Sequence, residues 1–277
     1  NGDGLVAILC LDIEDGFNGS GGYVGGYFWS GDLFPASLAD YSNEMEIMYI
    51  DIYPTMGTDI ANPDVANAYS TVVHEFQHMV NFNDYLTDWD QARPMDIWMD
   101  ESMSMAAEHM YNGVQYDRID YYNSSRSIAC GHSLLYWDDF GDVLSNYALS
   151  YLFSQYLRIQ TEGKVTEWDS IFEEIIADSD YDYRAIENVI MKYIAPDMTF
   201  GEFMTCFRTA LLLKADSGLF GFMGESGFDL INTLVYTGGA LELRGGGTVI
   251  IAIPDVFSDP DNCGLDIRFV GVSQEEN

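Results

Sequence analysis

The first 52 residues show the hydrophobic pattern of short β-strands. Residues 5–13 form an apolar run that ends in turn-forming residues, and residues 23–34 are aromatic and interspersed with glycine. Residues 45–52 alternate between apolar and polar positions well enough for a strand with one face closer to water. This part of the chain is therefore expected to form a β-sheet.

Helical spacing follows the predicted strands. Asn62 and Pro63 predict the N-cap and the first position of a helix over residues 63–81. A second helix is expected over residues 99–111, whereas residues 112–141 are irregular and polar. Further helices are expected over residues 143–159, 165–177, 183–194 and 199–214.

Glycines return after residue 218, where we expect a closing hairpin over residues 241–253 and a last strand over residues 266–272. A sheet, then helices, then a short β tail is typical of an α+β fold. We expect three parts: an N-terminal β-sheet lobe with the first helix, a helical lobe and a β-rich tail, over residues 1–82, 83–217 and 218–277.

The charge balance narrows the choice of partners. The chain has 45 Asp and Glu against 11 Lys and Arg, a formal net charge of -34. Such a surface repels phosphate backbones and anionic lipids, so binding to nucleic acid or to a membrane surface is not expected. Membrane insertion is not expected either, because no apolar stretch approaches the ~18–20 residues that a membrane span needs. It favours cationic partners and leaves Ca²⁺ open as a bound ion. No C-x-x-C spacing occurs, so a cysteine zinc site is unsupported.

The first long helix carries the sequence His74-Glu75-Phe76-Gln77-His78. Residues four apart lie on the same helical face, so His74 and His78 are spaced to bind one Zn²⁺. Glu75 points about 100° away from His74, beside such an ion, where it can take a proton from water and later deliver it to a leaving amine. The alternative is a pair of ordinary surface histidines beside an ordinary acid.

A third ligand is expected from the second helix. Glu101 follows His78 in the sequence Trp-Met-Asp-Glu-Ser, and Glu108 lies seven residues later on the same face. We predict Glu101 as a zinc ligand and Glu108 as the carboxylate that accepts a hydrogen bond from a ligand histidine. In so acidic a chain, both can also be solvated surface acids.

The sequence Val-Val-His-Glu-Phe-Gln-His-Met-Val-Asn-Phe, followed by Trp-Met-Asp-Glu-Ser-Met-Ser-Met-Ala-Ala-Glu, resembles the gluzincin zinc peptidases. It is most similar to the hyicolysin-like bacterial metallopeptidases, over residues 45–157. The resemblance implies a zincin-like catalytic domain with one zinc held by two His and a downstream Glu. It also implies a hydrogen-bond donor for the developing oxyanion. Tyr147 matches that position best, with Tyr151 and His132 as alternatives.

The resemblance further implies that residues 45–52 are the edge strand that pairs with an extended substrate, which makes Met45 and Glu46 candidate substrate-binding residues. The sequence Asn43-Glu44-Met45-Glu46 departs from the Gly-x-Met-Glu-Asn of zinc aminopeptidases, which favours internal cleavage.

We therefore predict a zinc endopeptidase that hydrolyses peptides or proteins. It is expected to be monomeric and to act as a secreted or cell-surface enzyme, although this chain carries no signal peptide. Two alternatives remain: an exopeptidase of the same clan, and a catalytically weak surface binding or adhesion domain. Glu75 argues against the binding domain, because binding alone needs no general base.

Overall fold

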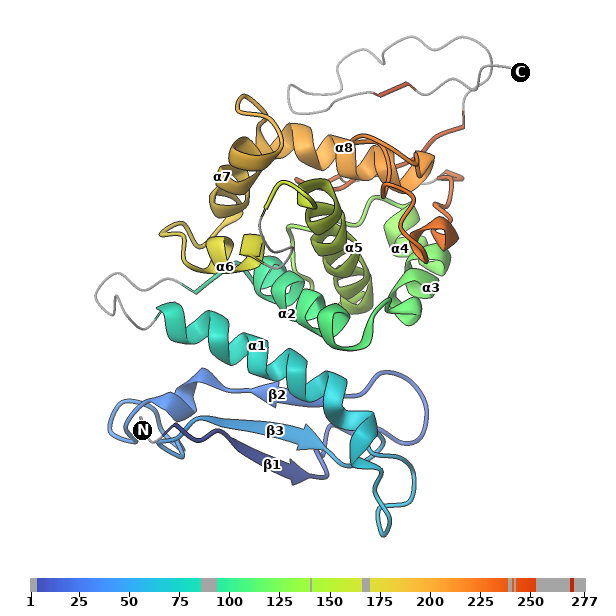
Figure 1. Ribbon diagram of the computed structural model, residues 1–277. Helices are drawn as coiled ribbons and strands as arrows, with labels where there is room; N and C mark the ends of the chain where they lie inside the picture. Colours follow the sequence, from blue (N-terminus) through green and yellow to red (C-terminus); the bar gives the residue numbers. More distant parts are fainter. Residues whose placement is uncertain are drawn as a thin grey trace.

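A computed structural model of the chain describes residues 4–85, 94–139, 141–165, 170–238, 241, 243–252 and 270–271. Helix α1 (Tyr69–Tyr85) runs between a small sheet and a group of helices (Figure 1). It packs against the sheet on one side and against α2 (Ile97–Asn112) on the other. The fold is α+β, and the helix with the two candidate histidines lies where its two parts meet.

The sheet consists of β1 (Ala7–Leu11), β2 (Gly26–Phe28) and β3 (Ile47–Asp51) in the order β1-β3-β2. β3 runs parallel to β1 and antiparallel to β2. Every residue of β3 is buried, and a strand pairs with each of its edges. The prediction that this segment is an edge strand is therefore wrong; β2 is the edge strand on the side of α1.

Beyond α2, the helical part contains the following helices: α3 (Tyr116–Ser124), α4 (Arg126–Ala129), α5 (Val143–Thr161), α6 (Ser170–Ile176), α7 (Tyr183–Tyr193) and α8 (Phe200–Leu213). α3 and α4 occupy a segment predicted to be irregular. In α3 only Ile119 and Tyr122 are buried, so its apolar periodicity is too weak to predict a helix.

The start of α1 also differs from the prediction. The carboxylate of Asp64 accepts a hydrogen bond from Ala66 N at 3.1 Å and caps a 3₁₀ helix over Val65–Ala68, after which α1 begins. The amide of Asn62 instead donates to Asp59 at 2.8 Å within the preceding turn. Asn62 is therefore not the N-cap, because the helical segment begins three residues later and Asp64 supplies the capping carboxylate. Another 3₁₀ helix spans Ser30–Leu33, and one spans Phe228–Leu230.

The predicted closing hairpin is not found in its described part, since residues 243–252 contain no strand. Gly247 N donates to Arg244 O in a turn, and Tyr236 N donates to Ile250 O at 2.7 Å. The predicted last strand lies outside the described residues, except for residues 270 and 271. The division of the chain into three parts stays a prediction.

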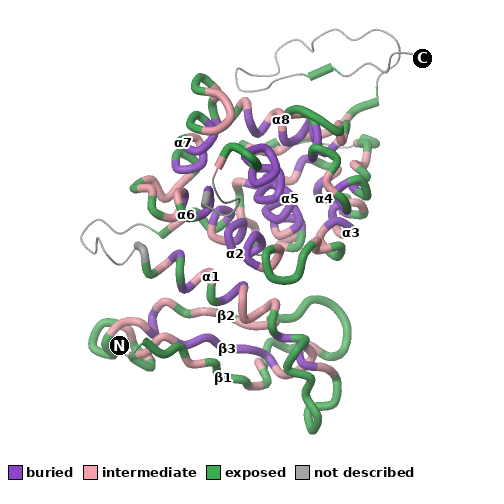
Figure 2. Tube along the Cα trace, viewed as in Figure 1, coloured by how far each residue is buried: buried purple, intermediate pink, exposed green. Residues whose placement is uncertain are grey.

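The main hydrophobic core surrounds α5, which is buried along most of its length (Figure 2). A second, smaller core lies between β3 and α1 and contains Ile50, Met56 and Ala68. Among the helices in the described part of the chain, none is both long and apolar enough to cross a membrane.

Candidate metal centre and active site

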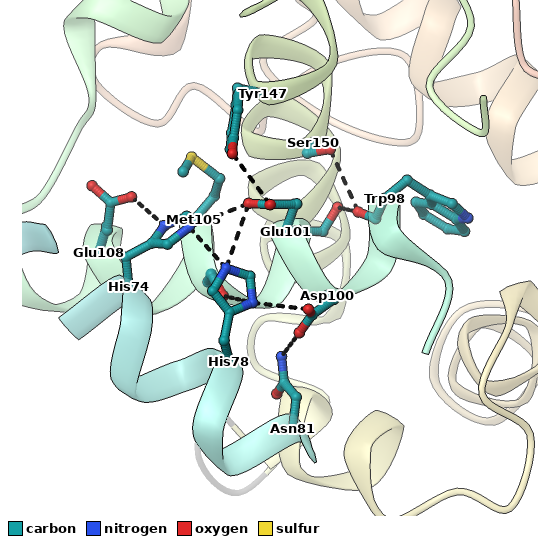
Figure 3. Close-up of polar contacts among 12 residues, drawn as sticks. His74, His78, Asn81, Trp98, Asp100, Glu101, Met105, Glu108, Tyr147 and Ser150 are labelled. Carbon is teal, nitrogen blue, oxygen red and sulfur yellow. Dashed lines mark hydrogen bonds and ion pairs between the residues drawn. The ribbon is translucent and has the colours of Figure 1, made fainter. Parts of the chain in front are cut away.

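The two histidines of α1 and Glu101 of α2 bring their side chains together between the helices (Figure 3). His74 Nε2 lies 3.0 Å from His78 Nε2 and 3.2 Å from Glu101 Oε2. His78 Nε2 lies 3.7 Å from the same Glu101 oxygen. This is the one group in the described part of the chain that offers three such donor atoms, and nothing there supports a Ca²⁺ ion.

Each imidazole contacts a second carboxylate through its other nitrogen. His74 Nδ1 lies 2.7 Å from Glu108 Oε1, and His78 Nδ1 lies 2.9 Å from Asp100 Oδ2. Ser104 Oγ also lies 3.2 Å from His78 Nδ1. These contacts fix the ring orientations and leave both Nε2 atoms directed at Glu101.

The sequence reasoning missed Asp100. Its other oxygen accepts a hydrogen bond from Asn81 Nδ2 at 2.6 Å, and Asn81 Oδ1 accepts one from Gln77 Nε2 at 2.7 Å. Asp100 directly precedes Glu101 on α2, and its side chain contacts His78. His78 lies one turn after His74 on α1. A signal existed, because each ligand histidine usually needs its own carboxylate or carbonyl partner.

The carboxylates control the protonation of His74. Burial alone would lower its pKa, but the contacts with the carboxylates of Glu101 and Glu108 outweigh burial and raise the pKa to about 10. Without a metal, a proton on His74 therefore offsets the negative charge of its neighbours. The carboxylates around the two imidazoles therefore favour a positive charge at this place.

Glu75 borders the same space from α1 and is 7% exposed. Burial raises the pKa of its carboxyl, while the charges of His74 and His78 oppose that rise. A raised pKa makes a carboxylate a stronger base, which suits a group that must accept a proton.

Tyr147 reaches the site from α5. Its hydroxyl donates a hydrogen bond to Glu101 Oε1 at 3.2 Å, and its ring centroid lies 6.4 Å from that of His74. Burial, together with the negative charges of Glu101 and Glu75, raises the pKa of this hydroxyl. The phenol therefore stays protonated and can donate a hydrogen bond.

A cavity of about 420 Å³ opens onto these groups. His74, Glu75, His78, Glu101 and Tyr147 all line it, so the structure brings the predicted ligands, base and donor to one space. Its other walls are partly apolar. The strand β2 contributes Gly26, Tyr27 and Phe28. The remaining lining residues are Ser30, Asn81, Phe82, Pro94, Met95, Ile97 and Asp100.

Neither alternative donor lies at this cavity. Tyr151 is fully buried, and its hydroxyl accepts a hydrogen bond from Gln115 N at 3.0 Å and contacts His109 Nδ1 at 3.0 Å. His132 contacts Asn146 and Ser127 through its two ring nitrogens, at 2.9 and 3.2 Å. Both side chains therefore make their contacts within the helical part, and Tyr147 is the one of the three candidates that reaches the cavity.

Met45 and Glu46 are also absent from the cavity lining. Met45 N donates to Asp32 O, and Glu46 O accepts from Ala7 N, both at 2.8 Å. These two backbone groups are thus used at the start of β3, by the 3₁₀ helix over Ser30–Leu33 and by β1. Both residues directly precede β3, which is the central strand and is separated from the cavity by β2, so their role in substrate binding stays a prediction.

No protein-family model matches the chain. The chain is 50% identical over 231 residues, 83% of its length, to the neutral metalloprotease ShpI of Staphylococcus hyicus. The chain is related to the hyicolysin-like metallopeptidases. The resemblance inferred from the sequence is thereby confirmed. The match covers 51% of ShpI, so the chain spans about half the length of this relative.

Proposed function

We propose that this chain is the catalytic domain of a zinc-dependent endopeptidase that acts on peptides or proteins outside the cell or at its surface. The observation that carries the proposal is the meeting of a His-His-Glu donor set, a buried Glu and a Tyr hydroxyl at one cavity. The relative's name, a neutral metalloprotease, supports the same class of activity.

The donor set fits a zinc ion. Ligand atoms held tetrahedrally at ~2.0–2.1 Å from zinc stand about 3.3 Å apart, and the three donor distances here are 3.0, 3.2 and 3.7 Å. Glu101 Oε2 is buried and accepts no hydrogen bond from a described residue, which a metal would remedy. When bound by His74, His78 and Glu101, zinc supplies Lewis acidity to the substrate carbonyl and to water.

The remaining groups supply proton transfer and charge stabilisation. Glu75 accepts a proton from the attacking water and delivers it to the nitrogen of the leaving amine. The hydroxyl of Tyr147 turns from Glu101 to the carbonyl oxygen as negative charge develops there. Glu108 and Asp100 hold the two imidazoles in place.

Internal cleavage is favoured by what borders the cavity. β2 has one edge that pairs with no other described strand, and an extended peptide can bind along such an edge by main-chain hydrogen bonds. An aminopeptidase needs an acid for the substrate amine, yet Glu44 is exposed and accepts a hydrogen bond from Ala36 N at 2.9 Å. Neither Glu44 nor Glu46 lines the cavity.

The test compares the wild-type chain with Glu75→Gln on a fluorogenic peptide blocked at both ends. The wild type should cleave the peptide internally, and the variant should lose about 10²–10⁴-fold in kcat because an amide cannot shuttle protons. Zinc content and melting temperature should be retained. Turnover by Glu75→Gln above about a tenth of wild type would exclude Glu75 as the base. Cleavage of peptides with a free N-terminus alone would identify an exopeptidase.

A further inference from the structure

The ring of Tyr147 has two unusual neighbours outside the residues that line the cavity. The guanidinium carbon of Arg118, on α3, lies 5.1 Å from the ring centroid. Trp137 meets the same ring edge-on, with centroids 5.1 Å apart and planes at 83°. A cation and a second aromatic ring therefore contact the side chain that points its hydroxyl at Glu101 (Figure 3).

Arg118 makes few other side-chain contacts in the described structure. Its nearest carboxylate is that of Asp117, at 3.8 Å, and the Asp117 side chain is 75% exposed. Its Nε is buried and makes no hydrogen bond to a described residue. An ion pair at that distance with an exposed partner such as Asp117 contributes little to stability. The ring of Tyr147 is therefore the main contact described for this guanidinium.

Tyr147 needs such a contact because of its place on α5. From Ser145 to Thr161, every residue of the helix is buried except Tyr147. Its neighbours along the helix are therefore fixed by the core, while its own ring extends out toward the cavity. Without a lateral contact, the ring would be free to leave the orientation that directs its hydroxyl at the reacting atoms.

We propose that Arg118 is a positioning residue: by stacking on Tyr147, it holds the hydroxyl where the substrate carbonyl oxygen becomes negative. The inference rests on the proposed function. A planar guanidinium suits this contact better than an ammonium, because it stacks on an aromatic face.

The test is a double-mutant cycle between Arg118→Met and Tyr147→Phe, read as kcat and KM on the blocked peptide. A lost cation–π contact should lower the kcat of Arg118→Met roughly 3- to 30-fold, and its KM should change by less than about twofold. In the Tyr147→Phe background, Arg118→Met should cause no further loss. The matched control is Lys192→Met, which removes a cation 4.8 Å from the ring of Tyr193 on α7 and should leave kcat unchanged.

The inference would be overturned if Arg118→Met kept the kcat of the wild type. It would also be overturned if the kcat losses of Arg118→Met and Tyr147→Phe multiplied in the double variant. If Arg118→Met does not fold, Arg118→Lys enters the same cycle; it keeps the charge without the planar stack, and its smaller loss should also vanish with Tyr147→Phe. Glu75→Gln separates the two proposals. If Glu75→Gln remains active, the proposed function itself is refuted. If Glu75→Gln is inactive but Arg118→Met keeps wild-type kcat, only the role of Arg118 is refuted.

Discussion

The core around α5 and the candidate metal centre between α1 and α2 are both buried, but different side chains fill them. The core consists mainly of aromatic and aliphatic residues such as Phe153, Phe203 and Phe207. The metal centre buries His74, Glu75 and Glu101 against one another. Apolar burial stabilises the folded chain, whereas acids packed together stabilise it only when a cation joins them.

Tyr147 and Tyr151 show the same contrast on a single helix. They are four residues apart on α5 and thus lie one turn from each other. Tyr151 is fully buried and its hydroxyl contacts His109 and Gln115, while the hydroxyl of Tyr147 reaches Glu101 at the cavity. Two tyrosines one turn apart on the same helix therefore place their hydroxyls in different surroundings, one in the core and one at the cavity.

The largest effect on stability is expected from Phe153→Ala. Phe153 is 1% exposed and its ring contacts those of Trp98, Phe200, Phe203 and Phe207. Its removal should lower the free energy of unfolding by about 3–5 kcal/mol, because a cavity replaces a packed ring. Urea unfolding measures the loss, and kcat per folded molecule should stay near that of the wild type. An unchanged urea midpoint would show that the core is not where this structure has it.

The next largest effect is expected from Tyr147→Phe, which should lower kcat about 10²–10³-fold with little change in KM, since one oxyanion donor is lost. Tyr151→Phe is the control on the next turn; it should keep kcat and reduce stability by about 1 kcal/mol, the value of a buried hydrogen bond. Steady-state kinetics and thermal unfolding of both variants test the contrast. A large kcat loss in Tyr151→Phe alone would reverse the two roles.

Smaller effects, on zinc affinity, are expected from the two carboxylates that contact the imidazoles of His74 and His78. Glu108→Gln and Asp100→Asn should each weaken zinc binding about 10- to 100-fold, because each loosens the orientation of one ligand histidine. Competition with a chromogenic chelator gives the affinities. Glu174→Gln is a control, because Glu174 pairs with exposed Lys192 and lies outside the cavity lining. Zinc affinities equal to that of the wild type would deny Glu108 and Asp100 this role.

The smallest effect for a single step, about tenfold per pH unit, is expected from a change of pH. Neighbouring carboxylates raise the pKa of His74 to about 10 in the metal-free chain, so below that pH the imidazole carries a proton that zinc must displace. Zinc affinity should therefore weaken as pH falls from 8 to 6, by roughly tenfold per pH unit for each proton displaced. The measurement is the same chelator competition at each pH, corrected for protonation of the chelator. An affinity independent of pH would contradict the protonated state of His74.

The sequence predicted what helical spacing controls. His74, His78 and Glu101 were found because helix periodicity fixes which side chains share a face, and the structure brings their donor atoms together. Asp100 was missed because it adjoins Glu101, and spacing along one helix does not say which acid faces the neighbouring helix. The order of the strands in the sheet could not be predicted from the sequence either. β3 lies between β1 and β2, so the edge strand at the cavity comes earlier in the chain than the strand predicted for that place.

The central claim is that His74, His78 and Glu101 form a zinc site on which peptide hydrolysis depends. The most direct measurement adds zinc stepwise to chelator-treated chain and follows bound metal and turnover of the blocked peptide together. Turnover should rise in proportion to bound zinc and stop at one equivalent, and a His78→Ala variant should gain neither metal nor activity in that range. Full turnover by the metal-free chain, or zinc uptake by the wild type and His78→Ala alike, would contradict the account.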